Sequence, residues 1–351
     1  MRTIGVAAVV AGMAGAAFGQ EKPAAVPASE ELVRVLESDA PQKDKATACR
    51  LLQRVGDKAA IPALARLLTD EKLAHMARYA LEPIPEPAVD EALRGALGKV
   101  NGRLLIGVVT SLGVRRDAQS VEAMARLLTH EDAGVVQAAA RALGSIGTAS
   151  SAKALMAALP RTAATNRLDF CEGLLRCAEG LAAAGSREEA VAIYDALRGM
   201  KDGPHQVRAA GVRGAILARR ELGLVLLKEY LQDKDFGLFA AACRTSQEMP
   251  GPDVTKALTA ALGSLPAENQ VLLIQTIGFR AEAAAVPALT MAAREGAKAV
   301  RLAAVRALAE IRHESALAAL RELAKDTDED LAKAATEGVN SFQPAQPPPR
   351  T

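Results

Sequence analysis

Aromatic residues are scarce in this sequence. They make up 3% of its 351 residues, with six Phe, three Tyr and no Trp. Strands are usually rich in aromatic and β-branched residues, so this composition argues against a β-sandwich or barrel. Half of the residues are hydrophobic and 24% are charged, which is typical of a folded chain and not of a disordered one. The abundance of alanine favours closely packed helices.

An excess of charge of either sign is also missing. Lys and Arg total 43 and Asp and Glu total 41, for a formal net charge of +2. Proteins that bind nucleic acid through phosphate contacts usually carry a strong positive excess. The composition therefore predicts no nucleic-acid partner.

Cysteine is rare, and no C-x-x-C motif is present, which excludes zinc ribbons and c-type haem attachment. All four cysteines fall on or near the packed faces of predicted helices. We interpret them as buried free thiols that behave as small apolar residues, although an even count would also allow disulfides. They are Cys49, Cys171, Cys177 and Cys243.

Long hydrophobic runs are absent except at the amino terminus. A basic start is followed by the uncharged stretch 4–18 and a small-x-small site that ends at Gly19. This pattern predicts a signal peptide over 1–19, because the stretch is shorter than the ~20 residues that span a membrane. An uncleaved N-terminal helix is the alternative. We expect an exported protein, periplasmic or extracellular, with a linker at 20–28 and a disordered proline-rich tail at 343–351.

An internal repeat of about 31 residues runs through the rest of the chain. Each copy is marked by an apolar anchor, which follows alanine in all copies but one, and nine copies can be recognised. The anchors are Leu64, Leu93, Met124, Leu155, Ile193, Leu227, Leu258, Leu289 and Leu320. Successive anchors are 29 to 38 residues apart, and the unit at about 163–202 is the longest.

Each copy contains two helical patterns. In the first, apolar residues from Val135 to Ile146 recur at the 3.6-residue period, and the same template fits Val300 to Ile311. Pro62 and Pro287 suit the first turn of a second helix. The sequence thus predicts an all-α fold, a right-handed α-solenoid of about nine antiparallel helix pairs over 29–342.

The run from Val136 to Gly147, which reads VQAAARALGSIG, resembles HEAT repeats of the short bacterial type named after phycobilisome lyases. The resemblance covers about residues 42–342. It implies a solenoid and indicates little about function, since this repeat serves many roles. Around Gly185, Ala190 and Tyr194 the long unit resembles a tetratricopeptide repeat, and a HEAT unit with longer helices is the alternative.

Two His-Glu pairs and one acidic run are candidate metal ligands. Deoxyhypusine hydroxylases are HEAT-repeat enzymes that hold iron with such pairs in equivalent places, but His130 and His313 occupy inequivalent places in distant units. We interpret both as solvated loop residues. The run that starts at Asp326 has the spacing of an EF-hand loop up to Glu337, but Leu331 stands where the loop needs Gly. We favour acidic helix caps there, with calcium binding as the alternative.

Several second helices carry a basic residue just after the anchor. Second helices line the concave face of a HEAT superhelix, so these side chains could form a basic ridge for an acidic protein segment or an anionic polymer, or they could be ordinary solvated charges. The ridge would consist of Arg66, Arg94, Arg126, Lys228 and Arg321.

We therefore predict an exported, non-catalytic scaffold that binds a protein or an extended polymer through this concave face, without a cofactor. The alternatives are a metal-dependent, lyase-like or hydroxylase-like HEAT-repeat enzyme and a structural envelope protein.

Overall fold

The computed structural model describes residues 27–342, and every regular element in this range is a helix. The predicted all-α class is confirmed. The predicted signal peptide, most of the predicted linker and the predicted tail lie outside the described residues. The α-helices are α1 (Ser29–Glu37), α2 (Gln42–Val55), α3 (Ile61–Arg66), α4 (Ala74–Leu81), α5 (Pro87–Leu97), α6 (Gly102–Val114), α7 (Val121–Leu127), α8 (Ala133–Ile146), α9 (Ala149–Ala158), α10 (Arg167–Ala183), α11 (Arg187–Arg198), α12 (His205–Ala218), α13 (Gly223–Tyr230), α14 (Phe236–Ser246), α15 (Pro252–Ala261), α16 (Ala267–Arg280), α17 (Val286–Glu295), α18 (Lys298–Glu310), α19 (Glu314–Leu323) and α20 (Glu329–Ser341).

The chain divides into two compact units, and the boundary between Val89 and Asp90 falls inside α5. In the first unit, α1 packs on α2 and α2 packs on α4. Its core contains Leu52, Leu64 and Leu81, all fully buried. Burial of such side chains is the main force that holds these short helices together.

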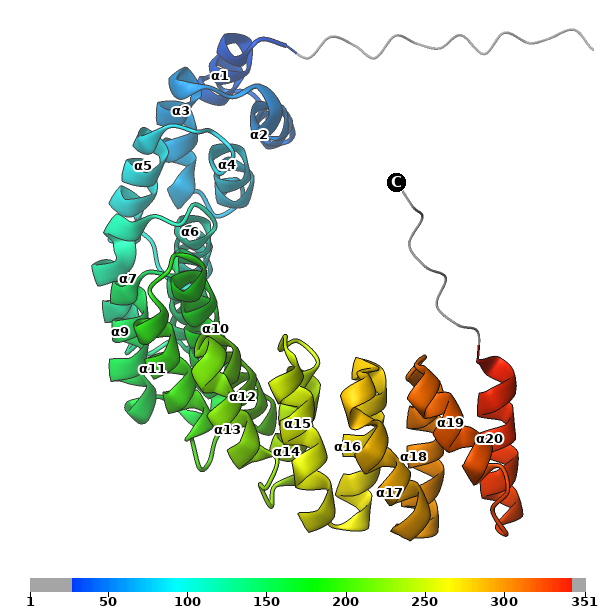
Figure 1. The fold of residues 1–351 in the computed structure, drawn as a ribbon. Helices are drawn as coiled ribbons and strands as arrows, with labels where there is room; N and C mark the ends of the chain where they lie inside the picture. The colour runs from blue at the N-terminus through cyan, green and yellow to red at the C-terminus, as the bar shows by residue number, and fades with distance from the viewer. Residues whose placement is uncertain (1–26, 343–351) are drawn as a thin grey trace, which may run out of the picture. The chain divides into compact units, whose positions relative to one another are not determined.

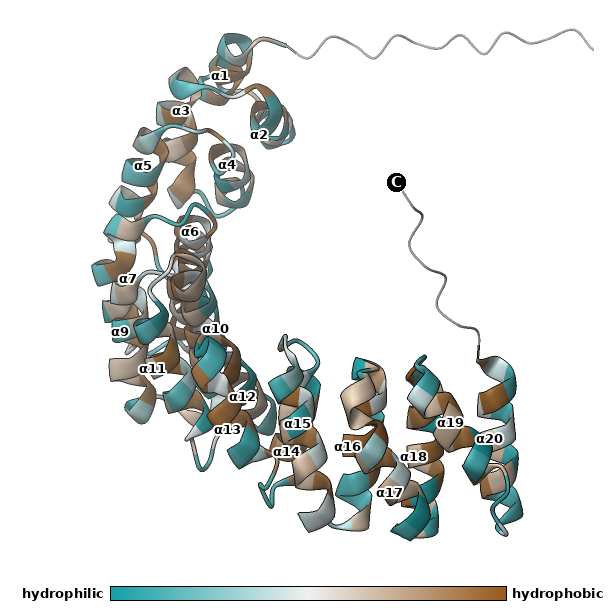
Figure 2. Ribbon diagram, viewed as in Figure 1, coloured by the Kyte–Doolittle hydropathy of each residue, from teal (hydrophilic) through white to brown (hydrophobic). Residues whose placement is uncertain are grey.

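In the second unit the helices form two rows. The even-numbered helices from α6 to α20 each contact the next even-numbered helix, and the odd-numbered helices pack alongside them (Figure 1). Hydrophobic and hydrophilic residues alternate along each helix, as expected where one side is packed and the other is not (Figure 2). We call the side of α6 to α20 that faces away from the odd-numbered helices the even face.

All nine predicted anchors lie in the odd-numbered helices from α3 to α19, and all nine are buried. All nine predicted copies of the repeat are therefore present. Pro62 and Pro287 lie in the first turns of α3 and α17, as predicted. Gly147 ends α8 in the left-handed conformation, with a φ of 70°.

The second copy of the helical template ends earlier than the sequence predicts. Ile146 is the last residue of α8, whereas α18 ends at Glu310 and Ile311 is extended, with φ of −80° and ψ of 94°. No glycine follows Ile311, so the left-handed ending of α8 is not repeated. Ile311 is nevertheless fully buried, so its predicted place in the core is kept.

Small residues allow neighbouring even-numbered helices to approach closely. A Cβ atom placed on Gly144 of α8 would lie 2.5 Å from the Cα of Gly173 in α10. One placed on Gly278 of α16 would lie 2.9 Å from the Cβ of Ala307 in α18. The glycine and alanine content thus has a structural cause, because larger side chains would push these helices apart.

The long predicted unit corresponds to α10, with 17 residues, and α11, with 12. Gly185 lies in the turn between them with a φ of +91°, which favours glycine. Both interpretations of this unit, a tetratricopeptide-like pair or a lengthened HEAT pair, include these two helices and the turn.

All four cysteines are buried and unpaired, as predicted. The Sγ atom of Cys177 lies 3.7 Å from the carbonyl oxygen of Leu143, and that of Cys171 lies 3.9 Å from Sδ of Met200. Burial raises the pKa of Cys177 and of Cys243 to about 12. These thiols therefore stay protonated and unreactive at neutral pH.

Candidate functional site

Three of the five predicted ridge residues pair with acidic neighbours. Arg66 of α3 lies 3.1 Å from a carboxylate oxygen of Glu37, within the first unit. Arg94 of α5 is half-buried and lies 2.7 Å from Oδ1 of Asp117, whose side chain is only 6% exposed. Arg126 of α7 forms an ion pair with Glu122, one turn earlier in the same helix. These pairs reduce the charge that the residues offer to a partner.

The other two ridge residues, Lys228 of α13 and Arg321 of α19, are exposed and form no ion pair with any described residue. Within the odd row, α7, α13 and α19 are separated from one another by other odd-numbered helices. Contact between the ridge residues and a partner stays a prediction.

The even face carries a second set of arginines at a repeated position. Four even-numbered helices have arginine nine residues after the N-cap, and α10 has one ten residues after it. All five are exposed. We call them the even-row arginines: Arg141 in α8, Arg176 in α10, Arg213 in α12, Arg244 in α14 and Arg306 in α18.

The even-row arginines differ in how far they are neutralised. Arg141 forms an ion pair with Asp169 of α10. Arg213 donates to both carboxylate oxygens of Glu248, in the turn that follows α14, at 2.7 and 2.5 Å. These hydrogen bonds raise the pKa of Arg213 and lower the pKa of Glu248.

Further along the same row the arginines are less engaged. Arg176 makes a long hydrogen bond of 3.4 Å to the hydroxyl of Ser145. Arg244 and Arg306 form no ion pair with any residue in the described range. Among the even-row arginines, those with charge available to a partner therefore lie on α10, α14 and α18.

Exposed apolar side chains share a register on the same face. Val114 of α6 is 59% exposed and Phe279 of α16 is 71% exposed, and each stands thirteen residues after its N-cap. Between α16 and α18 lies an open groove of about 460 Å³. Its lining includes Val271, Leu302 and the unpaired Arg306. The even face thus combines apolar and basic features.

A larger cavity of about 720 Å³ lies between the start of α13 and the turn that follows α14. The turn is held by Arg280 of α16, which donates to the carbonyl oxygens of Ser246, Met249 and Gly251 at 2.5, 2.8 and 3.0 Å. The Arg280 side chain is only 6% exposed. This buried arginine is a structural element of the fold.

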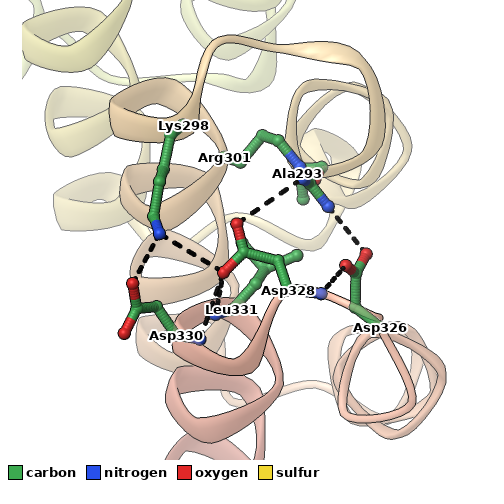
Figure 3. Close-up of polar contacts among 7 residues, drawn as sticks. All are labelled: Ala293, Lys298, Arg301, Asp326, Asp328, Asp330 and Leu331. Atoms are coloured by element: carbon green, nitrogen blue, oxygen red, sulfur yellow. Dashed lines mark hydrogen bonds and ion pairs between the residues drawn. The ribbon is translucent and has the colours of Figure 1, made fainter.

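The acidic run caps α20, as favoured from the sequence. Asp328 is the N-cap and accepts hydrogen bonds from the backbone of Asp330 and Leu331. Lys298 lies 2.5 Å from Asp330, and Arg301 lies 2.7 Å from Asp326, so α18 supplies cations to the run (Figure 3). Because α20 begins at Glu329, most of the twelve-residue stretch is helical, which the loop of an EF-hand cannot accommodate.

The two predicted loop histidines serve as hydrogen-bond acceptors. Nδ1 of His130 accepts from the backbone of Asp132 at 3.0 Å, and His313 is the N-cap of α19, where its ring accepts from Ser315. Within residues 27–342 no group of three or more His, Cys, Asp or Glu side chains is arranged to hold a metal ion. In the same range no helix is both long and apolar enough to cross a membrane.

Sequence reasoning missed the even-row arginines, although a signal for them was present. Arg141 lies inside the run that resembles a HEAT repeat, and Arg306 is its counterpart in the second copy of the same template. The predicted ridge residues all follow anchors, and the anchors all lie in odd-numbered helices.

A family model that describes HEAT repeats matches residues 91–174 and 255–340. Each stretch begins in an odd-numbered helix and ends in an even-numbered one. Counted from the start of each matched stretch, the even-numbered helices are the second helices of their pairs. Among curated proteins, none matches the sequence.

Three solved structures illustrate the similarity of fold. The karyopherin Kap121p bound to the extreme C-terminus of the protein phosphatase Cdc14p aligns with a TM-score of 0.52 and 11% identity, over 90% of this chain and 41% of that one. Kap95p, in a complex with RanGDP, aligns with a TM-score of 0.51 and 13% identity, over 90% of this chain and 50% of that one. The chain thus spans half or less of these karyopherins.

Human deoxyhypusine hydroxylase in complex with glycerol aligns with a TM-score of 0.32 and 16% identity, over 84% of this chain and 97% of that one. A score this low supports no conclusion about activity. The predicted solenoid is confirmed, and over residues 91–174 and 255–340 the chain is similar to HEAT repeats.

Proposed function

We propose that this protein is a non-catalytic scaffold that binds an extended segment of a partner protein along the even face of the second unit. The observation that carries the proposal is the set of even-row arginines, which recur at the same position, or within one residue of it, in five of the even-numbered helices. Arg176, Arg244 and Arg306 have charge available because no described acidic residue pairs with them. Repeated surfaces of solenoids suit long or flexible partners.

The order of the two helices within each repeat favours the even face over the odd-numbered helices as the binding surface. Second helices line the inner face of a HEAT superhelix, and the even-numbered helices come second when the pairs are counted from the start of each matched stretch. The expectation that basic residues on second helices line the concave face pointed to Arg126 and Arg321 when the odd-numbered helices were taken as second. With the even-numbered helices as second, the same expectation points to Arg244 and Arg306.

Two triple variants of the chain that begins at Gln20 distinguish binding by the even face from binding by the odd-numbered helices. The test variant carries Arg176→Glu, Arg244→Glu and Arg306→Glu, and the matched control carries Arg126→Glu, Lys228→Glu and Arg321→Glu. Each is used as bait in a crosslinking pull-down from the envelope fraction, after circular dichroism has shown unchanged helix content. We expect one protein to be captured by the wild type and the control and lost from the test variant.

Other results of this pull-down count against the proposal. Loss from the control variant alone would favour the ridge on the odd-numbered helices. Equal capture by all three baits, or capture by none, would contradict a charge-dependent scaffold on either row.

The proposal includes export, with cleavage after Gly19. The basic start and the uncharged stretch 4–18 support it. Mass spectrometry of the protein from fractionated cells should find Gln20 as the first residue, in the periplasmic or culture fraction. An intact Met1 in the cytoplasmic fraction would overturn this part.

A further inference from the structure

The groove between α16 and α18 has a buried floor of small residues and apolar walls. Gly278, Ala303 and Ala307 line it and are buried, whereas Val271 and Leu302 are half-exposed. The close approach at Gly278 and Ala307 is what leaves room above them, since neither residue carries a large side chain. With a volume of about 460 Å³, the groove is large enough for one aromatic or aliphatic side chain.

The rim of the groove is polar and contains a cation that no described residue pairs with. Arg306 and Glu310 of α18 and Gln275 of α16 line it. Phe279, 71% exposed, follows the lining residue Gly278 and extends the apolar area along α16. A partner side chain that enters the groove would therefore meet apolar walls with Arg306 beside them.

A second unpaired cation lies at the same level two helices away. Arg244 of α14 and Arg306 of α18 each stand nine residues after the N-cap, and Gln275 holds this position in α16 between them. Neighbouring packed helices are about 8–10 Å apart, so the two arginines are separated by about 16–20 Å. An extended peptide advances about 3.3 Å per residue and covers that distance in about five to six residues.

The mixture of charges favours a peptide over a uniformly anionic polymer. Glu310 of α18 and Glu337 of α20 also lie on the even face in this region, each exposed and without an ion pair to a described residue. They would repel a nucleic acid or an anionic polysaccharide, whose charge repeats along the whole chain. A peptide can place its carboxylates only at the arginines and can use the apolar groove as well.

Resting on the proposed function, we infer that the groove between α16 and α18 is the anchor site for an acidic peptide segment of the partner. One large apolar side chain of the segment occupies the groove. Two carboxylates, about five to six residues apart, bind Arg244 and Arg306, and the apolar residue stands between them in sequence, nearer to the carboxylate at Arg306. Arginine suits this role because its guanidinium binds carboxylates in a bidentate manner.

The test is a selection of random linear 12-residue peptides, displayed on phage, against the mature chain. The affinities of synthetic, fluorescein-labelled copies of the selected peptides are then measured by fluorescence anisotropy. The variants are Arg306→Glu and Phe279→Ser on the even face, and Arg321→Glu in α19 is the control. Arg321 is also exposed and without an ion pair to a described residue, so it matches Arg306 in kind.

We expect selected peptides with two acidic residues five to six positions apart and an apolar residue between them. Arg306→Glu should weaken their binding at least about tenfold, and Phe279→Ser should weaken it severalfold. Arg321→Glu should leave the affinity within about twofold of the wild type.

Each contrary outcome points to a different failure. Selected peptides that bind all variants equally, or that lack acidic residues, would overturn the anchor site and leave the scaffold proposal standing. No selected peptide at all would contradict the peptide-binding scaffold itself. A 20-nucleotide oligothymidylate serves as a competitor. If it displaces the labelled peptides at a lower concentration than unlabelled peptide does, the face binds nucleic acid and the inference is overturned.

Discussion

Arginine has two opposite roles in this protein, and burial separates them. The side chain of Arg280 is almost fully buried and donates hydrogen bonds to three carbonyl oxygens of one turn. It also donates to Oε1 of Glu282, at 2.6 Å. Arg244 and Arg306 are exposed and paired with no described acid. The first kind stabilises the fold, whereas the second kind has hydrogen-bond donors to offer to a partner.

Replacement of Arg280 by alanine should destabilise the protein by about 2–4 kcal/mol, because it leaves three carbonyl oxygens and Glu282 without their donor. Urea unfolding followed by circular dichroism measures this. Arg321→Ala is the control and should change the stability by less than about 0.5 kcal/mol. Equal unfolding midpoints for the two variants would contradict the structural role of Arg280.

The pair of Arg213 and Glu248 should make stability depend on pH in the acidic range. The hydrogen bonds from Arg213 lower the pKa of Glu248 in the folded state. The contribution of the pair is therefore complete above the unfolded-state pKa of about 4.3 and is lost as the pH falls through the lower folded-state value. NMR titration of the Glu248 carboxyl should give a pKa below 4.3.

The control for this titration is Arg213→Gln, which removes the cation and keeps a polar side chain. In this variant the pKa of Glu248 should return toward its ordinary value. A pKa that is the same in both proteins would show that the pair does not bind the carboxylate in solution.

At the scale of helices, glycine in the even row serves packing in one place and not in another, even within one helix. A Cβ atom on Gly173 of α10 would lie 2.7 Å from the carbonyl oxygen of Ala140 and 3.1 Å from Cδ1 of Leu155. One on Gly180 of the same helix would meet only the carbonyl oxygen of Gly147, at an ordinary 3.5 Å.

Alanine should therefore have opposite effects at these two positions. Gly173→Ala should destabilise the protein by about 1–3 kcal/mol, because α8 and α10 must move apart. Gly180→Ala should stabilise it by about 0.5–1 kcal/mol, because glycine lowers helix stability where nothing requires it. Thermal unfolding of both variants tests this, and a shift of the same sign in both would contradict the packing described for α8 and α10.

The repeat was predictable because each anchor, from Leu64 to Leu320, is a buried leucine, isoleucine or methionine whose spacing survives in the sequence. Which helix begins each repeat unit was not predictable from the sequence. A period of 31 residues is the same whether a unit is taken to begin with an odd-numbered or an even-numbered helix, so the spacing alone does not say which helix of a pair comes first. The choice of candidate residues depends on which helix is taken as second, so Arg126 was a candidate and Arg141 was not.

At the scale of the whole chain, the division inside α5 should be visible in how the protein unfolds. Contacts in repeat proteins are local, so a destabilising substitution in one unit lowers the stability of the adjacent helices first. Leu52 of α2 is fully buried in the first unit, and Leu52→Ala should cost about 2–5 kcal/mol there.

Hydrogen exchange of the full chain, followed by mass spectrometry, tests this division. In Leu52→Ala, amide protection should fall in α1 to α4 and stay near the wild-type level in α16 and α18. A uniform loss of protection across both units would mean that the chain unfolds as one cooperative block.

The four buried thiols have a practical consequence. None of them closes a covalent loop, so the fold requires neither an oxidant to form nor protection from a reductant to persist. The same conformation should be obtained from a reducing cytoplasm and from an oxidising compartment. A single cysteine introduced at an exposed position of the even face would then be the only thiol that reacts with a maleimide dye, so spectroscopic probes can be placed there without removing any native residue.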